Sequence, residues 1–560
     1  MLVNRNTRDK GASRLAEALP VGRLDPAHRE ALQAALALGI DFFEGGVRGN
    51  KVLRYKSLAE LKVAFSEEVP KEGSNLTEIL GQFREIAELS IGQSDPRYLA
   101  FPDTGNSVAA LAADLLTSFL NQNLIAVDRS APAATMVEAQ LLLWLRQVVG
   151  FGARSLNDED LTLADVGGMW TPGGNMSNTL AVMGGLHTHF PEVIECGLPA
   201  LTERPAIAMA KGIEHFSLPA AGILLGLGRE SLLWAEPTAD FVTDPDAVER
   251  ALDLASPGTR PFAIVAVAGN CRTTNVDDLE ALRRVADERG LWLHVDACHG
   301  GSLLFSEAHR DRLKGIEMAD SVSLDPHKGL FVTYPSSYVL FKDPCVAARL
   351  CRYQEKVFDP ECLDLGMITP FFGSRGFQSL KLWAMIKHLG LSGLSAAVSA
   401  RAEVNRSMTA ELRERGHFVL LNQNDFYRQA FVFLPLALRD AVRRARDDTA
   451  DSVADLISET TADFGETLYR RGLVCFDSFG LSDLTDQVGL GTGRKYTCMA
   501  MAIGHIAIEA SEREAIWREV DEVAAACSRQ MTTALSDIQS KEGRVRRQRS
   551  PTLEQSPASW

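Results

Sequence analysis

The sequence lacks long uncharged apolar runs, a secretory leader pattern and closely paired cysteines. A membrane-spanning helix needs roughly 18 apolar residues, but Asp114 and Arg272 interrupt the longest candidates. Residues 1–10 have no apolar core of the signal-peptide kind. The nine cysteines show neither metal-type nor disulfide-type spacing. We therefore expect a cytoplasmic protein with reduced thiols, no membrane partner and no metal.

Basic residues are fewer than acidic ones, which bears on the kind of molecule the protein can bind. The chain has 58 lysines and arginines against 73 aspartates and glutamates, a net charge of −15 at pH 7. This surplus argues against nucleic acid as the partner. The apolar share of 46% and the charged share of 23% are ordinary for a globular protein. At 560 residues the chain exceeds one ordinary core, so two or three lobes are expected.

The first 90 residues have a helical pattern. Apolar residues recur at helical spacing in 26–38 and in 76–87, and Gly45 and Pro70 mark loops between these stretches. The pattern predicts a helical segment over residues 1–90.

Three further segments follow. Within residues 91–390, and clearly from Asp165, short apolar strands alternate with helices, which is typical of an α/β domain with a largely parallel sheet and helices on both faces. Residues 391–535 mix short strands with amphipathic helices, so a small C-terminal α+β domain is expected. Residues 536–560 are basic, polar and contain proline, which predicts a disordered tail.

The chain is organised around the segment Ser323–Gly329, which reads SLDPHKG. Residues 318–324 have the pattern of a short strand, and Asp325-Pro326 breaks it. Lys328 therefore lies just beyond a strand end. There its amine can be buried in a crevice, where desolvation lowers the pKa and supports imine formation with a carbonyl.

A lysine after a strand is more often solvated, so the prediction of imine chemistry at Lys328 needs support from a second functional group. Residues 292–296 form an apolar strand pattern that ends in Asp296, 32 residues before Lys328. Asp296 could pair with a protonated pyridine nitrogen. A lysine for imine formation and a carboxylate for a pyridinium are what pyridoxal phosphate requires of a protein.

These residues resemble group II of the PLP-dependent decarboxylases, the family of the glutamate, aromatic amino acid and diaminobutyrate decarboxylases. The signature Asp325-Pro-His-Lys328 is specific, and the resemblance spans roughly residues 90–520. It implies the PLP-dependent transferase fold of aspartate aminotransferase (fold type I), pyridoxal 5′-phosphate as cofactor and a small-molecule amino acid as substrate. It also implies a homodimer, in which residues 1–90 pack on the partner subunit.

The resemblance also implies the contacts of the cofactor phosphate. The stretch from Gly173 to Asn178 matches the family's Gly-Gly-x-x-Ser-Asn motif before a helix, where free N–H groups form an anion site. The backbone of Gly174, Asn175 and Met176 would face the phosphate. His327 lies where the family contacts the same group.

Three more residues take positions that line the cofactor ring in the family. A lone histidine at a helix start usually bonds a local carbonyl, but the resemblance makes His215 the histidine that stacks on the ring and can move a proton. Asn270 replaces a threonine near the ring hydroxyl, and its amide can still donate. Cys298 replaces a small residue at the other ring face, where packing is favoured over redox chemistry.

The substrate is less visible in the sequence. Phe101 and Thr104 fall where the family contacts the bound amino acid, and the alternative is a loop that only packs under a helix expected at 108–120. Aromatic residues favour a partly apolar pocket, whereas Arg97 or Arg494 could receive a distal acid group.

One departure from the family concerns the proton donor. Its decarboxylases carry a mobile loop with a tyrosine that protonates the α-carbon, but the corresponding stretch Phe358–Arg375 contains no tyrosine. Phenylalanine, which some aldehyde-forming relatives have in its place, stands here at Phe358, Phe371 and Phe372. Arg375 matches a regularly placed arginine, interpreted as the hinge into the small domain.

Three functions remain open at this point. The first is an amino acid decarboxylase that releases the α-carboxylate as carbon dioxide. The second is a PLP-dependent aldehyde-forming enzyme or carbon–carbon lyase, suggested by the missing tyrosine. The third is a binding or regulatory protein without turnover, against which the presence of Lys328, Asp296 and His215 together counts.

Overall fold

A computed structural model describes residues 19, 22–350, 363–371, 373–423, 426–445 and 447–549. The chain divides into two compact units. One consists of Met1–Asp95 with Tyr469–Leu473, and the other of Pro96–Leu468 with Val474–Trp560.

The first unit is helical, as the periodicity of residues 1–90 predicts. Its helices begin at residues whose side chains accept a hydrogen bond from the backbone three positions on, namely Asp25, Ser57 and Asn75. Such caps satisfy an N–H group that has no partner within the helix. The helices of this unit are α2 (Pro26–Phe43), α3 (Leu58–Phe65) and α4 (Leu76–Leu89).

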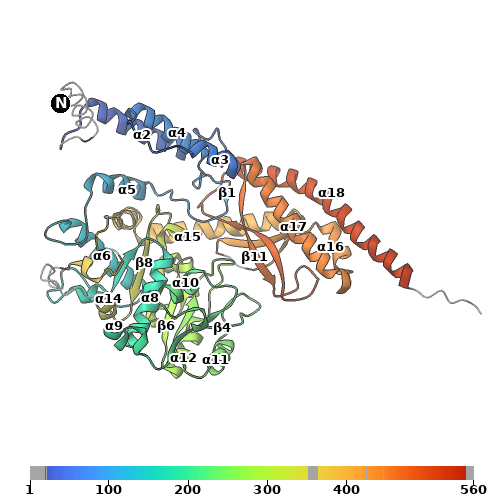
Figure 1. Cartoon of the computed structure of the whole chain (residues 1–560). Coiled ribbons are helices and arrows are strands. Elements are labelled where there is room, and N and C mark those ends of the chain that lie inside the picture. The colour runs from blue at the N-terminus through green and yellow to red at the C-terminus, as the bar shows by residue number, and fades with distance from the viewer. Residues whose placement is uncertain are drawn as a thin grey trace, which may run out of the picture. The chain divides into compact units, whose positions relative to one another are not determined.

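A seven-stranded sheet forms the centre of the second unit (Figure 1). Only β8 runs antiparallel to its neighbours, so the predicted α/β fold with a largely parallel sheet is confirmed. Its middle strands are almost entirely buried, which explains their continuous apolar runs. The strand order is β2 (Gly168–Thr171), β8 (Ser337–Phe341), β7 (Ser321–Leu324), β6 (Trp292–Ala297), β5 (Thr259–Val267), β3 (Arg204–Ala210) and β4 (Leu232–Ala235).

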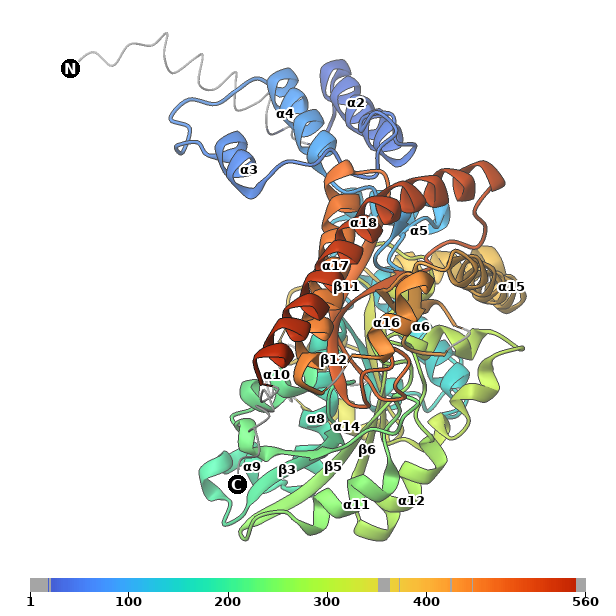
Figure 2. The same cartoon turned by 90° about the vertical axis from the view of Figure 1, so that its right-hand side faces the viewer.

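Helices pack on both faces of this sheet (Figures 1 and 2). One of them, α8, contacts β5, β7 and β8, and its N-terminus lies at the end of β2. The helices around the sheet are α5 (Val108–Leu120), α6 (Pro132–Val149), α8 (Gly174–His189), α10 (Ser217–Leu224), α11 (Pro245–Asp253), α12 (Leu279–Arg289) and α14 (Cys345–Leu350).

A second, five-stranded sheet follows the long helix α15 (Leu380–Glu414), which kinks at Gly390, where φ is 62°. Four strands come from the predicted C-terminal domain, but β1 comes from Tyr98–Leu99. We keep 91–390 and 391–535 as proposed domain boundaries, with β1 as a strand added to the smaller domain. This sheet contains β1, β11 (Cys475–Asp483), β12 (Arg494–Ala502), β10 (Arg428–Phe433) and β9 (Phe418–Leu420), with the helices α16 (Leu436–Arg443) and α17 (Asp447–Arg471) nearby in sequence.

The prediction of a disordered tail from residue 536 is wrong for most of that stretch. Helix α18 (Ala510–Arg549) continues through it, because its glutamine, lysine, glutamate and arginine residues favour a helix and the first proline is Pro551. Residues 550–560 lie outside the described part. Among the helices described, none is both long and apolar enough to cross a membrane.

Arg375, interpreted above as a hinge residue, forms a buried ion pair with Glu138 of α6. The Nη1–Oε2 distance is 2.8 Å, and Ser379 also donates to this carboxylate. We expect Arg375→Ala to lower the free energy of unfolding by about 3–5 kcal/mol, because it leaves Glu138 charged and unpaired in the interior. Urea unfolding followed by circular dichroism measures this change.

Arg349→Ala is the matched control. Arg349 pairs with Asp343, and both side chains are about half exposed. An exposed pair contributes at most about 1 kcal/mol, so the control should unfold near the wild-type urea concentration. Equal destabilisation of the two variants would contradict the role given to the buried pair.

Candidate active site

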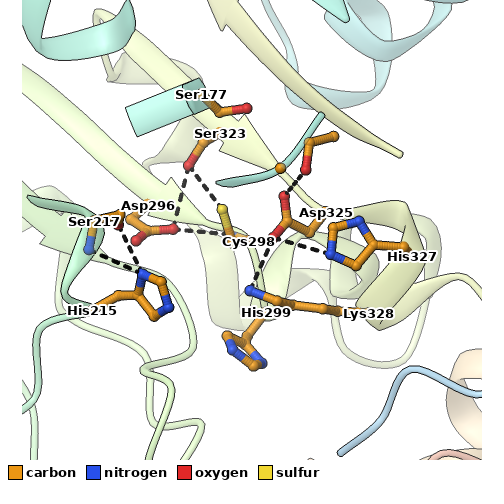
Figure 3. Close-up of polar contacts among 12 residues, drawn as sticks. Ser177, His215, Ser217, Asp296, Cys298, His299, Ser323, Asp325, His327 and Lys328 are labelled. Atoms are coloured by element: carbon orange, nitrogen blue, oxygen red, sulfur yellow. Dashed lines mark hydrogen bonds and ion pairs between the residues drawn. The ribbon is translucent and has the colours of Figure 1, made fainter. Parts of the chain in front are cut away.

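The predicted site residues follow strands that end at the same edge of the large sheet. Asp296 lies in β6, Lys328 follows β7, His215 follows β3, and Asn270 follows β5. Because these strands are parallel neighbours, their carboxyl ends meet at one edge, where α/β proteins bind ligands. Figure 3 shows Lys328, Asp296 and His215 around one space.

Lys328 lies in the short helix α13 (Pro326–Gly329), with its side chain mostly buried. Its Nζ is 2.9 Å from Oδ2 of Asp325. Burial alone would lower the pKa of Lys328, but the Asp325 carboxylate raises it well above the ordinary value. The expected low pKa is therefore corrected for this state, in which the amine is held protonated.

Asp325 is held in place by three other side chains. The hydroxyl of Ser337 donates to Oδ1 in a short contact. Lys328 forms its ion pair with Oδ2, and Nε2 of His327 is 3.6 Å from the same oxygen. Burial alone would raise the pKa of Asp325, but Lys328, His327 and Ser337 together lower it. The sequence analysis gave Asp325 no role, although its spacing of three residues from Lys328 was a usable signal.

Asp296 is buried at the end of β6 and both its oxygens accept hydrogen bonds. Asn178 Nδ2 donates to Oδ2 at 2.8 Å, while the backbone N–H of Cys298 and the hydroxyl of Ser323 donate to Oδ1 at 3.1 and 3.3 Å. Hydrogen bonds to a carboxylate stabilise its charged form. The carboxylate thus suits a cationic partner such as a pyridinium.

His215 reaches the same network through Ser217. Its Nδ1 accepts from the Ser217 N–H at 3.2 Å, which leaves the proton of the neutral ring on Nε2. The Ser217 hydroxyl lies 2.9 Å from Nδ1 and accepts from Asn178, which also donates to Asp296. Burial, followed by the charge of Lys328, lowers the pKa of His215.

Asn178 is a residue that the sequence analysis missed. Its Nδ2 bridges Ser217 and Asp296, and its Oδ1 is 3.1 Å from His294 Nε2. The asparagine of the Gly-Gly-x-x-Ser-Asn motif was the available signal. It joins the residue predicted to stack on the cofactor to the residue predicted to bind its nitrogen.

The start of α8 fits the expected phosphate. The helix has no side-chain cap at Gly173, and a Cβ on Gly174 would lie 2.6 Å from Cys298 Sγ and 2.8 Å from Asp325 Oδ2. Glycine therefore keeps this approach open beside Lys328. Gly174 and Asn175 stand in the first helical turn, whose N–H groups have no partner within the helix. The N–H of Met176 donates to Gly173 O at 2.9 Å, so its predicted phosphate contact would require breaking that bond.

Cys298 and His299 lie next to Asp296 (Figure 3). The thiol of Cys298 is 3.4 Å from the Ser323 hydroxyl, and burial raises its pKa well above the ordinary value. A thiol that resists ionisation is consistent with the predicted packing role. His299, which the sequence analysis did not select, contacts the Tyr427 hydroxyl, and burial lowers its pKa well below the usual value.

Asn270 does not point a free amide at the site. Its Nδ2 donates to Phe241 O at 3.1 Å and to Thr273 Oγ1 at 2.7 Å, and its Oδ1 accepts from the N–H groups of Arg272 and Thr273. Both amide hydrogens are thereby used inside the protein. The predicted bond to the cofactor is corrected to a role in shaping the turn after β5.

His327 is held by Ser336, whose carbonyl lies 2.6 Å from Nδ1, and its ring packs on Tyr334 at 4.2 Å. The Tyr334 hydroxyl donates to Oδ2 of Asp103 at 2.6 Å. Burial raises the pKa of Asp103, while Tyr334, Lys328 and His327 oppose this rise. Asp103 thus lies within electrostatic reach of Lys328.

The two predicted substrate residues flank Asp103. Phe101 is 42% exposed, and Thr104 is buried with its hydroxyl on Asn106 and on the carbonyl of Gly504. Among the described residues, neither makes a hydrogen bond to Lys328. Arg494 pairs with the exposed Asp451 and is not part of this site.

Part of the stretch Phe358–Arg375, which contains no tyrosine, lies outside the described residues. Phe358 and Phe372 lie outside the described residues, whereas Phe371 is described and half exposed.

Comparisons with known proteins show what this chain is similar to. The family described as the pyridoxal-dependent decarboxylase conserved domain matches residues 59–433. Human cysteine sulfinic acid decarboxylase is 31% identical over 437 residues, 76% of this chain and 85% of that protein. The mouse acidic amino acid decarboxylase GADL1 is 28% identical over 70% of each chain. A crystal structure of mouse CSAD superposes with a TM-score of 0.79 and 26% identity, over 90% of this chain and 99% of that one.

Proposed function

Since the chain belongs to the pyridoxal-dependent decarboxylase family, and is therefore a PLP-dependent amino acid carboxy-lyase, we propose that its substrate is an acidic amino acid. The proposal rests on the relatives, which are named for cysteine sulfinic acid and for acidic amino acids. The aldehyde-forming or lyase alternative is not favoured, because these relatives are decarboxylases.

The observation that carries the site assignment is the convergence of Lys328, Asp296 and the uncapped start of α8. Lys328 would attach the cofactor, Asp296 would hold its ring nitrogen, and the N–H groups of Gly174 and Asn175 would hold its phosphate. When bound, pyridoxal phosphate supplies an electron sink for the bond that breaks at the α-carbon.

The chain's own residues then supply binding and proton transfer. When not attached to the cofactor, Lys328 would stand in its ion pair with Asp325, 2.9 Å away, and would hold a proton at Nζ. Nε2–H of His215 is a second donor in the same space. We assign the proton that replaces carbon dioxide to one of these two groups.

The cationic side chains of the site support an acidic substrate. Arg272 and Arg428 both lie close enough to lower the pKa of the Cys271 thiol, although burial dominates and raises it. Burial lowers the pKa of His299, and the charges of Lys328 and Arg428 lower it further. Arg428 is already paired with Asp477, so a carboxylate or sulfinate side chain would be attracted mainly to Arg272.

We also propose a homodimer and a cytoplasmic location. Helix α5 exposes a row of large apolar side chains, which is unusual for a surface facing water alone. Six of the described cysteines form no disulfide, as in a reducing compartment: Cys196, Cys271, Cys298, Cys345, Cys498 and Cys527. The exposed α5 residues are Val108, Leu111, Leu115, Leu116, Phe119 and Leu120.

Product analysis tests the proposed function. Purified holoenzyme is incubated with cysteine sulfinate, aspartate, glutamate and aromatic amino acids, and carbon dioxide, amine, aldehyde and oxygen are measured. We expect an acidic amino acid to give equal amounts of carbon dioxide and amine without oxygen uptake. Aldehyde with oxygen consumption would support the alternative reaction, and activity on aromatic substrates alone would overturn the substrate class.

A further inference from the structure

A cavity of about 1020 Å³ opens on the other side of the turn that follows β5. Its walls come from Asp240 and Phe241, from Asn275, and from α15, β9 and α16. Four arginines line the cavity: Arg406, Arg413, Arg439 and Arg443. Among the lining residues that the structure describes, Asp240 is the one acidic side chain.

The positive charge of this cavity is only partly balanced. Arg406 pairs with Glu403, and Arg439 donates to the carbonyls of Leu434 and Phe418. Arg413 and Arg443 have no carboxylate partner among the described residues. Each stands in the last turn of its helix, where the carbonyl ends favour a cation but supply no full negative charge.

The guanidinium groups of Arg439 and Arg443 repel each other in the cavity. Burial lowers the pKa of Arg439, and the charge of Arg443 lowers it further. Like charges held together in this way are stabilised by a bound anion, and the planar guanidinium matches the oxygens of phosphate and carboxylate.

Two residues that line the cavity also carry buried polar atoms without hydrogen-bond partners among the described residues. Thr409 lines the cavity with 8% of the residue exposed, and its Oγ1 has no hydrogen-bond partner among the described residues. Oδ1 of Asn275, on the opposite wall, is likewise buried without a partner. A buried polar atom is costly unless it is hydrogen-bonded, and a side-chain rotation that brought either atom to the cavity surface would let it bond to a polar ligand.

The turn 270–275 connects the cavity to the edge of the large sheet that carries the candidate active site. The carbonyl of Asn275 accepts from the N–H groups of Gly269 and Asn270, at 3.2 and 3.0 Å. Asn422, another lining residue, donates to Thr273 O at 3.3 Å. A ligand that contacts Asn275 therefore touches the turn that carries Asn270.

We propose that this cavity is a second ligand site, which binds a small molecule carrying two or more negative charges and stabilises the turn 270–275. Its volume matches that of sites for organic ligands rather than for a single inorganic ion. The shared chemistry is a cluster of phosphate or carboxylate oxygens that bridges Arg413 and Arg443, with a polar group reaching Thr409.

The experiment is calorimetric titration of holoenzyme reduced with borohydride, in which the cofactor's own phosphate site stays filled. Pyrophosphate, ATP and citrate are titrated separately at constant ionic strength. We expect saturable binding, at least tenfold weaker in the double variant Arg413→Gln/Arg443→Gln and unchanged in Arg444→Gln. Arg444 is an exposed neighbour outside the cavity. Binding of pyrophosphate or ATP identifies a phosphorylated ligand, and binding of citrate alone identifies a polycarboxylate.

Hydrogen exchange supplies the second readout. Ligand binding should slow exchange of the amides in 270–275 in the wild type and not in the double variant, whose folding is checked by its urea midpoint. Absence of saturable binding for all three anions, or equal binding in both variants, would overturn the site. Binding without protection of the turn would overturn the coupling. Because binding rather than turnover is measured, either failure leaves the decarboxylase assignment intact.

Discussion

Replacing Lys328 with alanine is expected to lower carbon dioxide release by at least about 10³-fold. The amine at this position is the group that would bind the cofactor covalently and then act as an acid beside the reacting carbon. The loss should appear in kcat, and the visible absorbance of the wild-type holoenzyme should shift to that of free cofactor. Decarboxylation assays and absorption spectra of the purified variant measure both effects.

Lys314→Ala is the control for this prediction. Lys314 is 71% exposed and pairs with Glu280 at the surface, so its loss should change neither rate nor spectrum. Borohydride reduction followed by peptide mapping gives a direct test on the wild-type protein. A pyridoxyl group found on another lysine, or on none, would remove the basis of the site.

The position of the lysine could be predicted because it depends on local pattern. A short apolar stretch, a proline turn and the lysine follow each other within 12 residues, and the structure shows β7 and α13 there. The same holds for α5, whose predicted range 108–120 equals the observed one. Strand and helix periodicity is written in neighbouring residues, and tertiary contacts did not override it.

The connections between these positions could not be predicted in the same way. Asn178 and Asp296 are 118 residues apart, and their hydrogen bond exists only because α8 begins beside the end of β6. The pKa of Lys328 was misjudged because desolvation was considered without Asp325. Asn270 was assigned to the cofactor from the family resemblance alone, whereas its turn uses both amide hydrogens. These errors concern side-chain partners rather than the course of the backbone.

Asp296→Asn is expected to lower kcat by about 10²–10³-fold while the cofactor stays attached to Lys328. Asparagine has nearly the same shape and can still accept from Ser323 and the Cys298 N–H, so the fold should hold. It carries no negative charge, however, and cannot keep a ring nitrogen protonated. Stopped-flow measurement of carbon dioxide release, together with the holoenzyme spectrum, separates loss of rate from loss of cofactor.

The variant Asn178→Ala tests whether the effect of Asp296→Asn comes from the lost charge of Asp296 or from a change in how this side chain is held. It removes one hydrogen bond to Asp296 and the link to Ser217, but it leaves the carboxylate charged. We expect a loss of kcat smaller than that of Asp296→Asn, because the carboxylate keeps its charge and its hydrogen bonds from Ser323 and the Cys298 N–H. If Asp296→Asn retained wild-type kcat, the carboxylate would be a structural group of β6, and the cofactor's ring nitrogen would need another partner in the site.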